Sequence, residues 1–158
     1  MKRENQALRL AQMMQNKVTT YPSYELALPL VEVGRSKLKK LSTDSVVLLG
    51  LHDLSFVLIE NENICAKLAV EMIEDRCYLE IVNIDKQPVI VNDSKKYQLI
   101  KISFGKLQSR KLDIGYRIDV TQRSLKDVTV ILEGNKYASG SLVNVDGELA
   151  LKIEKVEI

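Results

Sequence analysis

The chain has 158 residues, 46% of them hydrophobic and 28% charged, and a formal net charge of +2. This composition is typical of a globular protein with one compact unit or two small ones, and the small net charge disfavours nucleic acid as a partner. No apolar run approaches the roughly 18 residues that a membrane-spanning helix needs, and the first residues precede no apolar core like that of a signal peptide. We therefore expect no membrane insertion.

Residues 3–18 carry the one clear helical pattern of the chain. Their apolar side chains recur at the spacing of a helix and would form a single stripe, which consists of Ala7, Leu10, Ala11, Met14 and Val18. The stripe either docks on the chain's own β-core or serves as a handle for a partner or for a domain that is missing here. Pro22 ends the helix, so residues 1–26 are predicted to form an N-terminal helix and a linker.

From residue 27 the chain alternates apolar and polar residues as β-strands do, and residues 127–158 show this pattern most clearly. They predict three strands separated by turns at Gly134-Asn135 and Asp146-Gly147, because asparagine and glycine tolerate the positive φ angles of tight hairpins. A three-stranded sheet of this size does not bury its apolar face alone. Another part of this chain, or another chain, must cover that face.

The covering part is predicted to be a second copy of the same unit. Residues 31–60 match residues 102–131 with an offset of 71, and the match continues after one residue is inserted near the Asn61 or Gly134 turn. The paired positions include Gly34 with Gly105, Val47 with Ile118, Val57 with Val128, and Leu79 with Leu151.

This repeat divides the chain into a first unit (27–83), a connection (84–98) and a second unit (99–158). Each unit is too small to bury a generous core, so we expect the two to pack on each other as a pseudo-symmetric pair. The connection contains Pro88 and a polar cluster. It is short, which favours pairing within one chain.

The order of glycines and aliphatic residues resembles that of the surface presentation of antigens (SpoA) domain. This domain is the C-terminal module of the flagellar motor switch proteins FliM and FliN and of the cytoplasmic ring (SctQ-type) protein of type III secretion systems. The motifs that carry the resemblance are Val33-Gly34-Arg35, Leu41, Ser45-Val46-Val47 and Leu49 in the first copy, and Gly105, Leu112, Gly115, Ile118, Val120, Ala138-Ser139-Gly140 and Leu142-Val143 in the second.

The resemblance covers about residues 27–158 and implies a fold class. We expect a mainly β protein with two intertwined SpoA-like small β-barrels, an intramolecular pseudo-dimer, after one N-terminal α-helix. The sequence departs from the pattern where the first copy has Leu68 and the second has Gly140. Three glycines, Gly34, Gly105 and Gly140, are predicted to be structural turns.

The same resemblance implies a scaffold protein and no enzyme. Its role would be in the cytoplasmic ring (the C-ring or sorting platform) of a type III secretion system, at the cytoplasmic face of the bacterial basal body. Its partners would be other ring subunits and the N-terminal segment of the stator-like regulator of the export ATPase. Tandem copies favour the secretion ring over the alternative, a flagellar motor switch. The ring protein's larger N-terminal domain is not present, which indicates a fragment, an internal translation product or a dedicated short form.

The resemblance also implies where the partner segment docks. The candidate partner-binding residues are aliphatic and lie in two predicted strands: Leu142, Val143, Val145, Val70 and Met72. Leu142 and Val143 should point to opposite faces of one strand. The alternative is that the other copy and the N-terminal helix cover both faces. Arg35 and Arg110 are either interface anchors or solvated side chains near turns.

The chain shows no pattern for catalysis, a cofactor or a metal. His52 is the only histidine and is expected in a solvated turn, while Cys65 and Cys77 stand 12 residues apart in strand patterns that suggest neither zinc nor a disulfide. Reduced thiols fit a cytosolic protein. The rival hypothesis is a small β-barrel that binds single-stranded nucleic acid or a nucleotide, which the aromatic content of 5% disfavours because such barrels stack bases on aromatic side chains.

Overall fold

The computed structural model describes residues 22–89 and 95–157 of the chain. These residues form eleven strands and one short helix, so the prediction of a mainly β protein is confirmed, while the predicted helix 3–18 lies outside the described residues. The elements are β1 (Ser23–Ala27), β2 (Val31–Gly34), α2 (Arg35–Lys39), β3 (Val46–Leu51), β4 (Ser55–Glu60), β5 (Asn63–Ile73), β6 (Arg76–Pro88), β7 (Tyr97–Gln108), β8 (Arg117–Asp119), β9 (Asp127–Leu132), β10 (Asn135–Val145) and β11 (Glu148–Val156).

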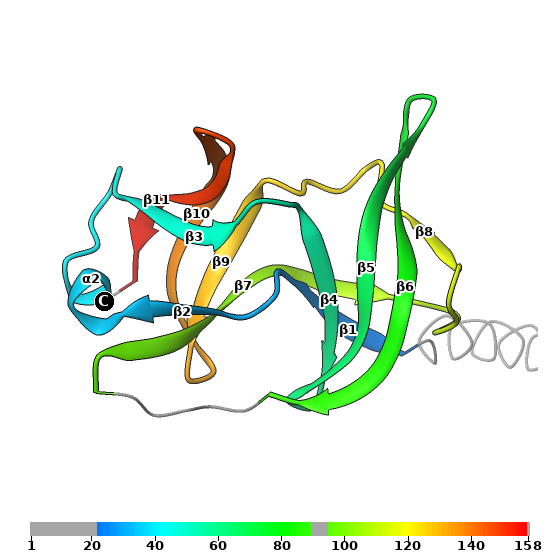
Figure 1. Ribbon diagram of the computed structural model, residues 1–158, viewed down its shortest axis with the longest axis horizontal. Coiled ribbons are helices and arrows are strands. Elements are labelled where there is room, and N and C mark those ends of the chain that lie inside the picture. The colour runs from blue at the N-terminus through cyan, green and yellow to red at the C-terminus, as the bar shows by residue number, and fades with distance from the viewer. Residues whose placement is uncertain (1–21, 90–94, 158) are drawn as a thin grey trace, which may run out of the picture.

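The strands form one antiparallel sheet in the order β3-β11-β10-β9-β7-β1-β4-β5-β6-β8, and β2 pairs with β7 beside this path. Figure 1 shows the sheet curled into two lobes, with β3, β10 and β11 in one and β4, β5, β6 and β8 in the other. The long strand β7 runs through both lobes. Within the described residues the sheet ends at β3 and β8. The prediction of small β-barrels is therefore wrong in that the sheet stays open.

The strand pairings of one half of the chain recur in the other half. β3 of the first half pairs with β11 of the second, where Val47 lies opposite Leu151. β8 of the second half pairs with β6 of the first, where Ile118 lies opposite Leu79. The offset that relates Val47 to Ile118 is 71, and Leu79 is related to Leu151 by 72. Each half thus gives its short strand to the sheet of the other half.

Backbone hydrogen bonds repeat the same exchange. The amide of Asp44 donates to the carbonyl of Ile153 at 2.8 Å, and the amide of Gly115 donates to the carbonyl of Ile81 at 2.7 Å. Asp44 and Gly115 both have positive φ angles, of 72° and 89°. The turn before β3 and the turn before β8 therefore share a residue with a positive φ and an equivalent hydrogen bond to the neighbouring strand, although glycine occupies only one of them.

The pairing of Gly34 with Gly105 in the sequence repeat is wrong. β1 pairs with β4 through Leu26 and Leu58, as β7 pairs with β9 through Ile102 and Val130. The structure thus relates Leu26 to Ile102 by an offset of 76, five more than the sequence match uses. The difference equals the length of α2, a five-residue helix that the first half alone contains between its first strands and β3.

The pairing of Val57 with Val128 is wrong for a related reason. Phe56 lies opposite Leu68, and Val128 lies opposite Gly140, so Phe56 and Val128 occupy equivalent positions. A register shift of one residue would turn the side chains of a strand to its other face. Because Phe56 and Val128 are both buried in the core, the inserted residue lies before these strands, earlier than the Asn61 or Gly134 turn.

One core serves both halves. Its largest fully buried side chains come from strands of each half and are Phe56, Leu26, Leu28, Leu58, Leu68, Leu79, Ile81, Ile100, Ile102, Leu151, Ile153 and Val130. The rings of Phe56 and Phe104 meet across the halves with centroids 5.2 Å apart. Burying each such side chain contributes about 1.5–3 kcal/mol, so we expect the two halves to unfold as one unit.

Some element boundaries differ from the predicted ones. β1 begins at Ser23, inside the predicted linker, and β6 extends to Pro88. β7 begins at Tyr97. The strands therefore take up both ends of the predicted connection 84–98.

Candidate functional site

The outer face of the lobe formed by β3, β11 and β10 carries aliphatic side chains. Leu48 lies opposite Ala150, which lies opposite Val143, so these three side chains form one row across three strands. Val46 and Val145 extend the same face, since they are two residues away from Leu48 and Val143 on their strands. We call Val46, Leu48, Val143, Val145 and Ala150 the apolar face.

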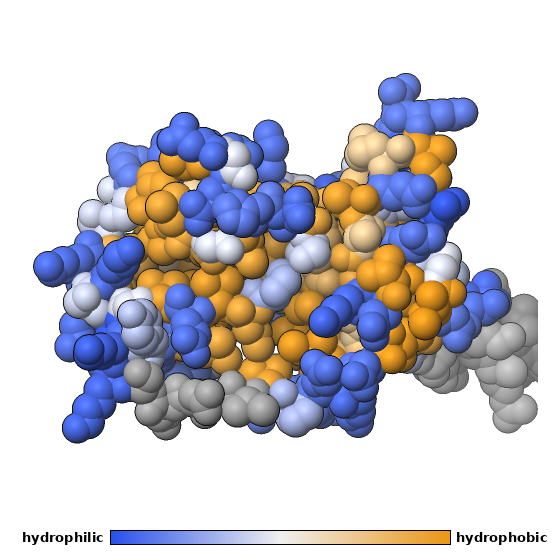
Figure 2. Space-filling model, viewed as in Figure 1, coloured by the Kyte–Doolittle hydropathy of each residue, from blue (hydrophilic) through white to orange (hydrophobic). Residues whose placement is uncertain are grey.

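The apolar face is accessible from solvent at its edges. Val46 is 50% exposed and Leu48 is 52% exposed, whereas Ala150 in the middle of the face is fully buried. Figure 2 shows apolar side chains at the surface over this end of the molecule and over the β5–β6 arm, between charged ones. Contiguous exposed aliphatic side chains on one sheet face are typical of a protein contact.

The equivalent face of the other lobe has the same backbone pairing and a different surface. Arg117 and Asp119 on β8 occupy the positions of Val46 and Leu48, and Glu71 on β5 occupies that of Val143. Arg117 Nε lies 3.1 Å from a carboxylate oxygen of Glu71, and Arg76 Nη1 lies 2.8 Å from one of Asp119. The charges on this face, which we call the charged face, are thus paired with one another.

Local hydrogen bonds hold the charged face in place. The hydroxyl and the amide of Thr121 donate to Asp119 at 2.6 and 2.9 Å, and together with Arg76 they hold the pKa of that carboxyl below its ordinary value. The amide of Cys77 donates to the hydroxyl of Thr121 at 3.0 Å. Burial, and then the nearby Asp119 carboxylate, raise the pKa of the Cys77 thiol, which disfavours a reactive thiolate.

The structure separates the predicted partner-binding residues into groups. Val143 and Val145 belong to the apolar face, whereas Leu142 points to the other side of β10 and packs against the core. Val70 also packs against the core, and Met72, further along β5, is 65% exposed. Four strands of the sheet separate β10 from β5. The five residues therefore do not form one surface in the sheet.

Three residues of the apolar face are absent from the predicted site: Val46, Leu48 and Ala150. Val46 and Leu48 belong to the run Val46-Val47-Leu48-Leu49, in which the alternate residues Val47 and Leu49 are buried. Aliphatic residues on both faces of a predicted strand indicate that its outer face is covered as well, and this pattern could have identified Val46 and Leu48. The same signal is typical of a fully buried strand, and the sequence does not show that β3 ends the sheet.

The three predicted turn glycines have different roles. Gly34 joins β2 to α2 with an ordinary φ of −58°. Gly105 lies within β7 at a bulge, with a φ of +97°, so its prediction as a turn is wrong as well. Gly140 lies inside β10, so its prediction as a turn is wrong; a Cβ there would lie 2.2 Å from the carbonyl oxygen of Lys152.

The remaining candidate residues lie at the surface or pair within the fold. Arg35 donates to the side chain of Gln98 at 3.1 Å, and Arg110 is exposed. His52 is exposed after β3, as expected for a turn residue. Cys65 and Cys77 are both free thiols.

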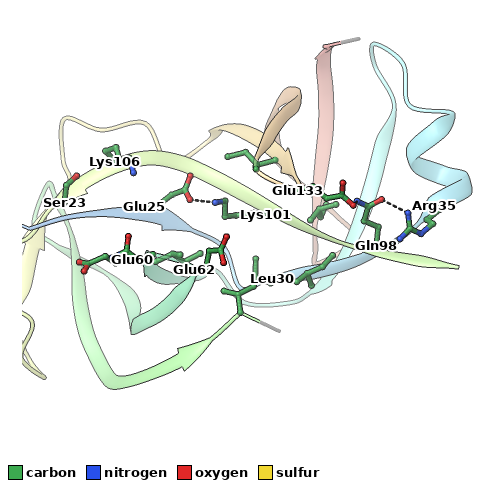
Figure 3. Close-up of a pocket in the computed structure, with 17 residues that line it drawn as sticks. Ser23, Glu25, Leu30, Arg35, Glu60, Glu62, Gln98, Lys101, Lys106 and Glu133 are labelled. Atoms are coloured by element: carbon green, nitrogen blue, oxygen red, sulfur yellow. Dashed lines mark hydrogen bonds and ion pairs between the residues drawn. The ribbon is translucent and has the colours of Figure 1, made fainter. Parts of the chain in front are cut away.

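A pocket of about 530 Å³ lies where the two halves meet. Figure 3 shows Glu25 and Lys101 pointing toward each other inside it, where they form an ion pair. The hydroxyl of Ser103 also donates a hydrogen bond to Glu25 at 2.9 Å. The pocket also contains the carboxylates Glu60, Glu62 and Glu133 together with the cations Arg35 and Lys106. This mixture of charges disfavours a polyanionic ligand.

Neither the protein-family models nor the curated proteins contain a match to the chain. Among the described residues, no group of three or more histidine, cysteine, aspartate or glutamate side chains is placed to hold a metal ion. In the same residues no helix has the length and apolar character that crossing a membrane requires.

Proposed function

We propose that this chain is a scaffold subunit of the cytoplasmic ring of a type III secretion system, built as an intertwined pair of SpoA-like units in one chain. Two sequence copies that exchange β3 and β8 are the observation that supports the proposal most. Such an exchange interlocks the copies, so a single subunit is a rigid block with two pseudo-equivalent ends. A rigid subunit with two similar ends suits assembly into a ring. A flagellar motor switch is the alternative role for the same fold.

The proposed mechanism is recruitment by a surface, without chemistry. The apolar face would bind the N-terminal segment of the regulator of the export ATPase at the cytoplasmic face of the basal body, with Leu48 and Val143 on either side of Ala150. An aliphatic side chain of this size contributes about 1–3 kcal/mol when a partner fully covers it. Other ring subunits would contact the remaining surface. The role of a nucleic-acid or nucleotide binder is disfavoured by the mixed charges of the pocket between the halves.

The solution mass of the full chain tests the proposal, measured alone and with the N-terminal segment of the regulator from the same organism. The variant Val46→Arg, Leu48→Asp, Val143→Glu copies the charged face onto the apolar face. We expect the wild-type chain to gain one segment and this variant to gain none. Val46 lies opposite Lys152, and Glu148 stands where the charged face has Arg76, so the new charges do not all gain the partners they have in that face. Urea unfolding of the variant must therefore show that it is folded before its binding is compared with the wild type.

A matched control changes the three equivalent positions of the charged face: Arg117→Gln, Asp119→Asn and Glu71→Gln. This control should bind the segment like the wild type. The proposal fails if the wild-type chain gains no segment, or if the apolar-face variant and the control bind it equally well.

A further inference from the structure

Each lobe of the sheet has a seam where its end strand faces another strand without pairing. The first seam lies between β3 and β2 and contains a pocket of about 590 Å³, lined by Val47 and Leu48 on one wall and by Val33 on the other. The second seam lies between β8 and β7 and contains a pocket of about 330 Å³, lined by Asp119 and Leu107. The two seams are equivalent places in the two halves, but the first is the larger.

A side chain of the protein bridges the second seam. Arg123 follows β8, and its Nη2 donates to the carbonyl oxygen of Lys106 on β7. The amide of Arg123 also donates to the carbonyl of Val120 at 2.9 Å, which holds the arginine at this place. In the first half the residue at the offset of 71 is His52, which is exposed. The first seam therefore keeps open the space that Arg123 occupies in the second.

The β3 wall of the first seam presents backbone groups that can pair with a strand. The amide of Ile153 donates to the carbonyl of Ser45 at 2.8 Å, and Val47 lies opposite Leu151, so Ser45 and Val47 direct their backbone groups toward β11. In an antiparallel pair the intervening residues direct theirs to the opposite edge. The amides and carbonyls of Val46 and Leu48 thus point to the seam, where an extended segment could add as a further strand.

The walls of the first seam are apolar at the base and basic at the rim. Val33 and Val47 are buried, and Leu48 and Tyr97 are each about half exposed. The lysines Lys37, Lys95 and Lys96 line the rim with Arg35, against one acidic residue, Glu32. Lys37 and Lys95 are both exposed. Their charge favours carboxylates on a bound segment, whereas the β3 wall favours aliphatic side chains.

We propose that the first seam binds an extended, acidic peptide segment of a partner protein, which adds as a strand to the free edge of β3. Alternate side chains of the segment lie on the inner side, where they pack on Val47 and Val33, and the intervening carboxylates face Lys37 and Lys95 at the rim. The segment takes the place that Arg123 takes in the second seam. The seam shares Leu48 with the apolar face, but the inference does not rest on the proposed function, because the lysines that select the segment lie outside that face.

Selection of peptides on the full chain tests the proposal. The probe is a library of random peptides of about ten residues, long enough to span β3 and both rims. We expect the selected peptides to alternate aliphatic and acidic residues. Binding of a selected peptide should weaken about tenfold or more in the variant Lys37→Glu with Lys95→Glu, since each new carboxylate repels the peptide.

Two controls and one spectroscopic measurement make the test specific. The variant Lys67→Glu with Lys86→Glu makes the same change of charge at exposed positions of the other lobe, and it should bind like the wild type. Val82→Glu, which adds one negative charge at an exposed position of β6, should also leave peptide binding unchanged. Hydrogen exchange of the Val46 and Leu48 amides should slow when the peptide binds.

Two outcomes would overturn the proposal. One is a set of selected peptides without excess acidic residues. The other is a bound peptide that leaves exchange of the β3 amides unchanged, since a segment held outside the seam does not pair with that edge.

Discussion

β3 and β8 occupy equivalent ends of the sheet and differ on the side that faces solvent. Their inward residues match in character, since Val47 and Leu49 on β3 correspond to Ile118 and Val120 on or beside β8. The outward residues of β3 are the aliphatic Val46 and Leu48, whereas the outward residues of β8 are charged and form ion pairs. Burial in the shared core restricts the inward side chains, whereas the outward ones can change without loss of the fold. The two halves therefore share a fold while they present different surfaces at these outward positions.

The glycine inside β10 marks the sharpest difference between the halves in packing. Gly140 corresponds to Leu68, which is buried on β5, yet a Cβ at Gly140 would lie 2.2 Å from a backbone oxygen of β11. We expect Gly140→Ala to lower the free energy of unfolding by about 3 kcal/mol, because a backbone atom must move to relieve the contact. Urea unfolding measures the change.

The control for this prediction is Gly34→Ala. Gly34 has an ordinary φ, and a Cβ added at this position would lie 3.9 Å from its nearest neighbour, the carbonyl oxygen of Lys96. This substitution should change stability by less than about 0.5 kcal/mol. Equal costs at Gly140 and Gly34 would show that β10 and β11 do not approach each other as described.

The next largest expected effect on stability comes from Arg123, which bridges the second seam. Arg123→Ala removes the side chain that joins the turn after β8 to the carbonyl of Lys106, and we expect a loss of about 1–2 kcal/mol because that carbonyl loses a charged donor. Arg110→Ala, at an exposed position, serves as the control and should cost less than about 0.5 kcal/mol. If both variants unfold at the same urea concentration, Arg123 does not bridge the seam.

The smallest expected effect is the pH dependence of the charged face. The folded protein holds the pKa of Asp119 below its ordinary value, so this carboxylate stabilises the fold above about pH 4 and loses its contribution as the pH falls through the lower folded pKa. The difference in stability between the wild type and Asp119→Asn should therefore shrink as the pH falls from 7 to about 3. Urea unfolding at both pH values tests this. A difference that stays constant would mean that Asp119 is not held as an ion.

Part of the site is predictable from the sequence and part is not. Alternation in β10 predicts Val143 and Val145, and the opposite directions of Leu142 and Val143 follow from the same period of two. The other half of the apolar face comes from β3, which is about a hundred residues away in the chain and reaches β11 only through the exchange of strands. No local pattern encodes such a partner, since alternation indicates which residues share a face but not which strand lies beside them.

The sequence by itself determined the β-meander at residues 127–158, because alternating side chains and turn residues act over a few positions, and it showed that the chain contains two copies of one unit. The tertiary structure decided which strands pair, how the copies are related in register and where the sheet stays open. Gly34 and Gly105 illustrate the reason. The sequence repeat aligns these two glycines, but in the structure Leu26 and Ile102 occupy equivalent buried positions. Burying the apolar side chains of whole strands contributes more free energy than the placement of one glycine does.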